Sequence, residues 1–521
     1  MQTTNEACDD TMSALVRKEW IGFRSRGRIT ALLIAVLITV LFGLLLAFTE
    51  RSTCGVRDVE VACPTDPVGP QGRAVSDQFY FTHQALGDDG SITVRMTEMT
   101  GVITYPPPDH DEIVPGLVPW AKAGIIVKDG STPGSSYAAL MLTGDHGVRM
   151  QHDYVHDTAG QSGGVSPTTP RWLRLSRSGN TITGAESSDG VHWTKVGTAR
   201  LPGLPETVRV GLFATSPGDL TLKPTGLGAS TSQTRFTQAS ATFDNVTVDG
   251  GAGTGWTHEA VGDMGNTDWE RSHRAPGTTE SNGTLTVTGS GDIGPVATVG
   301  GHAVEDTLVG LPIALIVVIA VSARFLTGKR RGDQPAHAPL GARVLAAKAF
   351  VAGATAFLTG LVAAGIAVPI GTTVLRANGS SVLAVPALVE LRTVVAAAAL
   401  VAVTTVLALA LCALLRRAWA AVLVTTAAVV LPYVVGTLPL LPDEISGALL
   451  RFSPAAGFAV LQTLQEFPQV IAHYAPQEGY FPLPGWAGLA VLCGCTAALL
   501  GLAVIRERRR ATGPGPEPKW R

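Results

Sequence analysis

The sequence predicts a polytopic α-helical membrane protein that carries a large all-β sandwich domain outside the membrane. Six stretches of at least 17 residues contain no charged side chain, and about 20 apolar residues in a helix cross a hydrocarbon core of about 30 Å. The 521-residue chain has a net charge of −2, but residues 49–306 carry −12 and the remainder carries +10. The two parts therefore suit different environments. The overall balance argues against a nucleic-acid-binding protein, which would be basic.

Residues 1–28 are expected on the cytoplasmic side, before a first span at 29–48. From residue 12 to residue 28, apolar side chains including Trp20 fall in one helical arc, with Glu19 as the exception. This pattern predicts an interfacial helix on the inner leaflet; the alternative is a basic topology signal with a tryptophan anchor. A secretory signal peptide is disfavoured, because the apolar run is too long and no small-residue cleavage site lies near its end.

Five further spans complete the membrane part. They are predicted at 307–325, 343–375, 391–415, 418–441 and 485–505. Lysine and arginine gather before the first span, between the second and third, between the fourth and fifth, and after the sixth. By the positive-inside rule both termini are cytoplasmic, including the tail 506–521 and the loop 326–342. The segment 442–484 then faces outside, and its amphipathic, aromatic pattern predicts re-entry into the outer leaflet.

The cysteines and the basic residues suggest a compartment and a source. Cys54 and Cys63 lie in a connector, 49–74, that follows the first span. A disulfide between them is permitted outside the cell and would contribute about 2–3 kcal/mol. The chain has 31 Arg against 8 Lys, with abundant Ala and Gly, which suggests a GC-rich bacterial genome. The expected location is therefore a bacterial plasma membrane.

Residues 75–249 have the pattern of an all-β sandwich, with short alternating runs separated by Gly, Asp and Pro. Ser188, Asp189 and Gly190 are typical of a hairpin turn, because Asp and Gly tolerate positive φ. A second β-rich piece at 250–306 is expected to form a stalk or to cap the sandwich.

Several motifs of this domain occur in a characteristic order. They are Asp77-Gln-Phe-Tyr-Phe-Thr-His-Gln, Trp120-Ala-Lys-Ala-Gly-Ile-Ile-Val-Lys, Trp172-Leu-Arg-Leu-Ser-Arg-Ser-Gly-Asn, Ser188-Asp-Gly-Val-His-Trp and Phe243-Asp-Asn-Val-Thr-Val. In this order they resemble a concanavalin-like, DUF1349-type β-sandwich over residues 77–248. The resemblance implies a jelly-roll fold and, in some members, carbohydrate binding. The candidate ligand-binding residues are Trp120, Trp172, Asp189 and Trp193; the alternative for each tryptophan is packing in the core.

Two clusters in the domain have metal-ligand chemistry. Asp109, Asp111 and Glu112 offer the oxygen ligands that calcium prefers. His152 and His156 have a spacing that suits zinc on a helix, but this segment is predicted as strand and loop, where they would lie about 13 Å apart. Solvated loops are therefore predicted at both places, and no metal site. No pair of carboxylates can be placed together, so glycosidase chemistry has no support.

The membrane part has a resemblance of its own. It rests on Val16-Arg-Lys-Glu-Trp-Ile-Gly-Phe-Arg-Ser-Arg and on Arg343-Val-Leu-Ala-Ala-Lys after a basic loop. These residues resemble bacterial ABC-2-type transporter permeases, over 13–48 and 307–510. Six spans with both termini inside is that family's arrangement, and the β-domain between spans one and two departs from it. The resemblance implies a partner ATPase that docks on a coupling segment, with candidate residues Arg324, Lys329, Arg330, Arg331 and Arg343.

The expected function follows from this resemblance and from one absence. The sequence has no Gly-x-x-x-x-Gly-Lys-Ser/Thr motif, so the chain is not expected to be an enzyme or to bind a cofactor. ATP and magnesium would be held by the partner. The chain is predicted to be the permease of an ABC exporter, paired with a second permease. Because the spans lack charge, an amphipathic or lipid-like cargo is favoured over protons or ions. The alternative is a membrane-anchored sensor or cell-wall-glycan-binding protein without transport activity.

Overall fold

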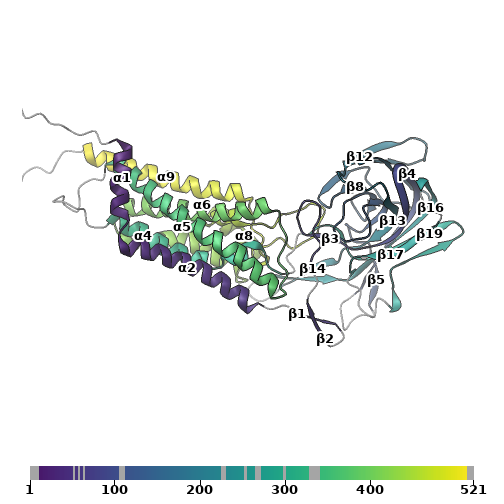
Figure 1. Cartoon of the computed structure of the whole chain (residues 1–521), viewed down its shortest axis with the longest axis horizontal. Helices are drawn as coiled ribbons and strands as arrows, with labels where there is room; N and C mark the ends of the chain where they lie inside the picture. Colours follow the sequence, from purple (N-terminus) through teal and green to yellow (C-terminus); the bar gives the residue numbers. More distant parts are fainter. Residues whose placement is uncertain are drawn as a thin grey trace, which may run out of the picture.

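The computed structural model describes residues 11–50, 53–56, 59–62, 65–104, 112–224, 230–251, 255–264, 272–296, 301–327 and 341–512. An elongated bundle of helices continues at one end into a β-domain (Figure 1). Within the described residues, five helices are long and apolar enough to cross a membrane. The predicted combination of membrane-type helices and a β-sandwich is confirmed at this level. The second predicted span forms an apolar helix of only 17 residues, α4.

The long helices follow the charge-free runs of the sequence. Their bounds are α2 (Arg26–Thr49), α4 (Leu311–Thr327), α5 (Ala342–Ala377), α6 (Ala387–Leu415), α7 (Ala418–Thr437) and α9 (Gly485–Thr512). Pro369 and Pro432 lie inside α5 and α7, where packed neighbouring helices help to satisfy the backbone groups that a proline frees. Only Arg416 and Arg417 separate α6 from α7. Arg416 adopts φ 59°, and this left-handed residue turns the chain back.

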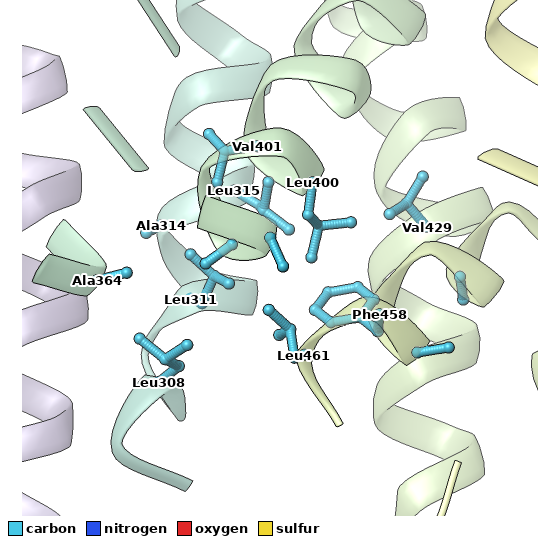
Figure 2. Packing of buried hydrophobic residues seen from close by; sticks show 14 of the residues in the cluster. Leu308, Leu311, Ala314, Leu315, Ala364, Leu400, Val401, Val429, Phe458 and Leu461 are labelled. Atoms are coloured by element: carbon cyan, nitrogen blue, oxygen red, sulfur yellow. The ribbon is translucent and has the colours of Figure 1, made fainter. Parts of the chain in front are cut away.

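The bundle core is built from branched aliphatic residues and small residues. Figure 2 shows Leu311 and Leu315 of α4 pointing toward Leu400 of α6 and toward Phe458. Small residues let the backbones approach closely, as in many membrane helix pairs. A Cβ added at Gly360 of α5, for example, would lie 2.8 Å from the Cα of Ala398 of α6. The helices are therefore tightly packed along their shared faces.

An irregular segment closes the end of the bundle that meets the β-domain, which is called the outer end below. It contains α8 (Asp443–Phe452) and the 3₁₀ helices η3 (Pro454–Leu461) and η4 (Pro476–Glu478). Six of the eight residues of η3 are buried. A Cβ at Gly457 would lie 2.6 Å from a Leu492 side-chain carbon, so η3 packs directly on α9. This segment inserts between the helix ends instead of running over them as a loop.

Most strands of the β-domain belong to one 14-stranded sheet that wraps around its core. Their bounds are β4 (Phe79–Thr104), β5 (Ile113–Pro115), β6 (Lys122–Lys128), β7 (Tyr137–Thr143), β8 (Val148–His152), β9 (His156–Ala159), β10 (Arg171–Ser178), β11 (Thr181–Ser187), β12 (Thr194–Arg200), β13 (Val208–Thr215), β16 (Thr237–Gly251), β17 (Thr257–Val261), β18 (Gly277–Ser281) and β19 (Thr284–Gly289). Short pairs are formed by β1 (Thr53–Val56) with β2 (Val59–Ala62), β3 (Val75–Asp77) with β20 (Ile293–Pro295), and β14 (Asp219–Pro224) with β15 (Ser230–Arg235).

The sheet has the order β12-β11-β10-β4-β13-β6-β7-β8-β9. The 26-residue strand β4 holds it together, because β10, β13, β16 and β17 all pair with it. Every residue of β6 and β7 is buried. Ile125 faces the main core and Ile126 faces a second, aromatic core that contains Phe79 and Phe213. The centre of the sheet is therefore covered on both sides.

The β-rich segment at 250–306, predicted as a stalk or a cap, pairs with strands of the main sheet. β19 pairs with β16 along Ala239–Phe243, and β17 pairs with the start of β4. Leu285 and Val287 of β19 lie in the main core. The strands of this segment are therefore part of the sandwich itself. The reason is the alternation at 284–288, which gives β19 one apolar face that only the sandwich core can bury.

Specific contacts join the two parts of the molecule. The backbone N–H of Ala74 donates to the carbonyl of Ala384, at 2.8 Å. The Arg73 guanidinium lies 5.8 Å from the ring centroid of Phe467, and the Gln469 amide donates to the Val155 carbonyl at 3.3 Å. The outer loop between η3 and η4 therefore lies against the β-domain.

Candidate functional site

A cavity of about 330 Å³ lies at the outer end of the bundle, from which the β-domain extends. Its walls come from the ends of α2, α4 and α7, from η2 (Val304–Leu308) and η3, and from the residues around η4. The apolar part of the lining includes Leu308, Leu311, Phe458 and Leu461, which also border the bundle core in Figure 2. The cavity therefore extends that core toward the β-domain.

Glu305 is the principal polar group of the cavity. Its Oε1 accepts from the Thr463 backbone N–H at 2.8 Å, and its Oε2 accepts from the Thr463 hydroxyl at 2.5 Å. Desolvation by burial raises the pKa of the Glu305 carboxyl to about 7, although both hydrogen bonds act in the opposite direction. Thr463 thus fixes the position of the Glu305 carboxylate through two hydrogen bonds.

A second carboxylate lies next to it in sequence. Asp306 Oδ2 accepts from the Ala303 backbone N–H at 2.8 Å, which caps η2. The same oxygen lies 3.5 Å from His302 Nδ1, and hydrogen bonding to Asp306 raises the pKa of His302. The Asp306 side chain remains 42% exposed. It therefore adds negative charge at the polar side of the cavity.

Aromatic rings form much of the opposite wall. The rings of Tyr433 and Phe458 stack with centroids 3.9 Å apart and an interplanar angle of 14°. Tyr480 also lines the cavity, and its hydroxyl donates to Glu466 Oε2 at 2.8 Å. No lysine or arginine occurs among the described residues of the lining. The site therefore combines two carboxylates with aromatic and aliphatic surface.

Two apolar side chains of the cavity lining also reach the surface of the bundle. Val309, which lies between η2 and α4, is 50% exposed, and Leu46 of α2 is half-buried. Both side chains belong to the outward-facing apolar surface of the helices. The lining is therefore accessible near Val309.

The ligand residues predicted for the β-domain divide into two places. Trp172 packs against the loop that joins β11 to β12, since a Cβ at Gly190 would lie 2.8 Å from its ring. Trp193 Nε1 donates to the Gly190 carbonyl at 3.2 Å, so Asp189 and both tryptophans meet around this loop. Trp120 lies elsewhere, 5% exposed and stacked on His146.

The polar atoms of that loop are already engaged. Asp189 Oδ1 accepts from the backbone N–H groups of Val191 and His192, both at 2.8 Å, and its Oδ2 lies 2.7 Å from His192 Nδ1. The side-chain hydrogen bond with His192 lowers the pKa of Asp189. The Arg174 guanidinium lies 3.9 Å from the centroid of the Trp193 ring. Asp189 thus stabilises the loop, and one face of Trp193 is covered.

The metal-like clusters have separate outcomes. Asp109 and Asp111 lie outside the described residues, and Glu112 is exposed. Within the described ranges no group of three or more His, Cys, Asp or Glu could hold a metal ion. The predicted separation of about 13 Å between His152 and His156 is wrong, because their rings stack at 4.4 Å.

The two histidines meet because the chain reverses between them. Asp153 and Tyr154 have positive φ, 45° and 70°, so β8 and β9 form a tight hairpin that places His152 directly opposite His156. Desolvation by burial lowers the pKa of His152 to about 4. Gln71 contacts His156 Nε2 at 2.9 Å. These contacts tie the hairpin to the chain that enters the domain.

The remaining predicted residues are placed only in part. Cys63 lies outside the described residues, so its bridge to Cys54 stays a prediction. Lys329, Arg330 and Arg331 also lie outside the described ranges. Arg324 is exposed in the last turn of α4, and Arg343 is exposed in the first turn of α5. The last turn of α4 and the first turn of α5 lie at the end of the bundle remote from the β-domain (Figure 1).

Sequence reasoning did not single out Glu305. One signal was available, because Glu305 and Asp306 directly precede the charge-free run that begins at Thr307. Acidic residues beside a predicted span are common, however, and do not by themselves indicate a site. What distinguishes Glu305 is its contact with Thr463, which is 158 positions away.

Comparisons with known proteins add little to this description. No family model matches the chain, and no curated protein matches it. Solved structures similar to part of it include a functionally unknown protein from Saccharomyces cerevisiae (16% identity, TM-score 0.22, covering 36% of this chain and 86% of that one). Another is scytalido-glutamic peptidase (8% identity, TM-score 0.26, 42% and 99%). A third is the GH43 protein BlXynB from Bacillus licheniformis (15% identity, TM-score 0.19, 31% and 28%). Similarities this weak carry no argument about function.

Proposed function

We propose that the chain is the membrane-spanning permease subunit of an ATP-driven ABC exporter, working with a separate ATPase subunit and a second permease. In this proposal it crosses a bacterial plasma membrane six times, with both termini in the cytoplasm and the β-domain outside. The helix α4 is the second span; its 17 residues cover about 25 Å, and η2 extends it toward the outer surface.

The observation that carries the proposal is the distribution of charge along the bundle. Basic residues mark the helix ends opposite the β-domain, namely Arg26, Arg28, Arg324, Arg343, Arg416, Arg417 and Arg506. Arg376, Arg392 and Arg451 are the basic residues of the helices and outer segment at the other end. This asymmetry is what the positive-inside rule requires when the β-domain faces outside.

The N-terminal helix supports the same orientation. α1 (Met12–Phe23) lies across the bundle at the end remote from the β-domain, roughly perpendicular to the long helices (Figure 1). Leu15 and Phe23 are buried, whereas Arg17 and Lys18 are exposed. An amphipathic helix in this place would lie in the inner leaflet interface. The ends of α4 and α5 reach the same level, so a partner ATPase could contact all three.

The function proposed for the outer cavity is to hold cargo on its way out. The ATPase would drive the helices between arrangements that open inward and outward, and the cavity would be the outward-facing part of the path. Its apolar lining suits an amphipathic molecule better than a hydrated ion. The β-domain, which contacts the outer loop through Gln469, would act at the exit by gating or by binding the cell wall.

The test is purification of the full chain from its own host, with identification of bound subunits. We expect an ATPase with a Walker A motif to co-purify and its hydrolysis to be stimulated by the chain. Replacing both arginines (Arg324→Glu with Arg343→Glu) should remove that stimulation, whereas Arg376→Gln at the opposite end should not. If no ATPase is ever recovered, or if the double variant stimulates normally, the transport proposal is wrong.

A glycan-binding or sensor protein without transport activity is the competing proposal. The meeting of Trp172 and Trp193 around Gly190 is the observation that favours it. Retention of the full chain on cell-wall glycan, lost in Trp172→Ala and kept in Trp120→Phe, would support this role. Because glycan binding and transport can coexist, only the ATPase experiment decides between the two proposals.

A further inference from the structure

We infer that the outer cavity binds an amphiphilic organic cation, with its positive group beside Glu305 and Asp306 and its apolar part along Leu308 and Phe458. The inference rests on the proposed function in that this molecule would be the cargo. It goes further by naming the chemical class of the ligand and the groups that select it.

The charged side chains that line the cavity favour a cation. Two carboxylates and one histidine line the cavity, and the described lining contains no lysine or arginine. Two arginines lie near this wall without lining the cavity: Arg392 donates to the Gln462 carbonyl and Arg451 donates to the Pro482 carbonyl. An anionic headgroup would therefore meet the Glu305 carboxylate, which, unlike Asp306 with His302 at 3.5 Å, forms no ion pair among the described residues. A cation would supply the missing partner of a poorly hydrated carboxylate.

The hydrogen bonds that these two carboxylates already accept favour an organic cation over a metal ion. Both oxygens of Glu305 already accept hydrogen bonds from Thr463, and Asp306 already caps η2. A small metal ion needs several free oxygen ligands at 2.0–2.6 Å, and the described residues contain no such cluster. A diffuse organic cation needs only nearby negative charge and aromatic faces. The stacked rings of Tyr433 and Phe458 provide such surface.

The volume and position of the cavity suit a small amphiphile. The volume of about 330 Å³ lies at the lower limit for small-molecule pockets. It suits a charged group with a short apolar portion, and the half-exposed Val309 in the lining leaves room for a longer tail to extend along the bundle surface.

The experiment measures binding to the full chain in nanodiscs of dioleoylphosphatidylcholine, without any ATPase. The probe is radiolabelled tetraphenylphosphonium, and tetraphenylborate serves as a matched ion of opposite charge; empty nanodiscs correct for partitioning. We expect saturable binding of the cation only. Glu305→Gln should weaken it at least tenfold, and Val309→Trp should weaken it by filling the exposed edge of the cavity lining. Glu390→Gln, which changes a carboxylate near Arg376 outside the cavity, should leave it unchanged.

The outcomes separate this inference from the proposed function. Equal binding of both ions, no saturable binding, or full binding by Glu305→Gln in a chain with the wild-type melting temperature would overturn the cation site. None of these results concerns the ATPase. If the cation binds as expected but no ATPase is recovered from the host, the site stands and its role as a cargo site falls. If Glu305→Gln lowers the melting temperature, binding by Val309→Trp decides the test instead, because the Val309 side chain lies at the surface.

Discussion

Glu19 Oε2 lies 2.7 Å from Lys348 Nζ, and this ion pair joins α1 to the first turns of α5. Both side chains are only about one-sixth exposed, at 16% and 15%. Lys348 Nζ also lies 4.1 Å from the centroid of the Phe325 ring, which Phe23 of α1 meets edge-on at 5.0 Å. The acidic residue that interrupts the apolar arc of α1 is thus the residue that fastens this helix to the bundle.

We expect Glu19→Gln to weaken the attachment of α1. Removing the carboxylate leaves the Lys348 ammonium partly buried without its charge partner, which should cost about 1–3 kcal/mol of unfolding free energy. Lys348→Met should cost a similar amount, and the double variant should cost clearly less than the sum of the two. Thermal melting in nanodiscs measures all three changes, with Arg17→Gln on the exposed face of α1 as the control. Strictly additive losses would show that the pair does not couple the two helices.

A second ion pair should have a larger effect on the β-domain. Lys128 Nζ lies 2.7 Å from Asp77 Oδ2, and both side chains are completely buried. The same oxygen accepts from the Tyr154 hydroxyl at 2.8 Å and from the Gly134 N–H at 2.8 Å. Asp77→Asn should therefore destabilise the domain by about 3–5 kcal/mol, because it leaves a buried ammonium uncompensated.

The partly exposed pair Arg95–Asp244 provides the comparison for this prediction. Its side chains are 35% and 23% exposed, so Asp244→Asn should cost about 1 kcal/mol or less. Chemical denaturation followed by the fluorescence of the domain's tryptophans measures both losses in the full chain. Comparable losses for the two variants would mean that burial does not set the strength of the Asp77 pair.

How much of this architecture the sequence predicts depends on the range of the interactions involved. The apolar helices and the strands follow from local patterns, since runs without charge and alternation at period two are visible within 20 residues. His152 and His156 were misplaced because a single tight hairpin, set by two residues with positive φ, reverses the strand between them. The outer cavity was not foreseen, because it needs η2, α7 and η3 together, and sequence patterns do not encode contacts across 158 positions.

Close packing between α2 and η2 gives a further prediction. A Cβ on Gly43 of α2 would meet the backbone carbonyl of Thr307, which cannot move without displacing η2. Gly43→Ala should therefore push η2 and Glu305 away from α2, lowering the melting temperature by several degrees and weakening cation binding. Gly27, which has open space around its Cβ position, is the matched control. An unchanged melting temperature and full binding in Gly43→Ala would mean that this contact is not tight.

The pH dependence of cation binding tests the state of Glu305 directly. Burial raises the pKa of its carboxyl to about 7, so the group is neutral below that pH and negatively charged above it. Affinity for tetraphenylphosphonium should therefore rise between pH 6 and pH 8, by up to tenfold.

The groups facing Glu305 must be separated from it in that experiment. Asp306, Tyr433, Thr463 and His302 all lie close to Glu305, and among them the pKa of His302 is raised by its hydrogen bond with Asp306. His302 loses positive charge as pH rises, which also favours a bound cation, so the sign alone does not identify the titrating group. In His302→Gln we expect the rise to persist, whereas in Glu305→Gln it should shrink to the small part that His302 contributes. A rise that disappears in His302→Gln and survives in Glu305→Gln would assign the titration to the histidine and contradict the role given to the carboxylate.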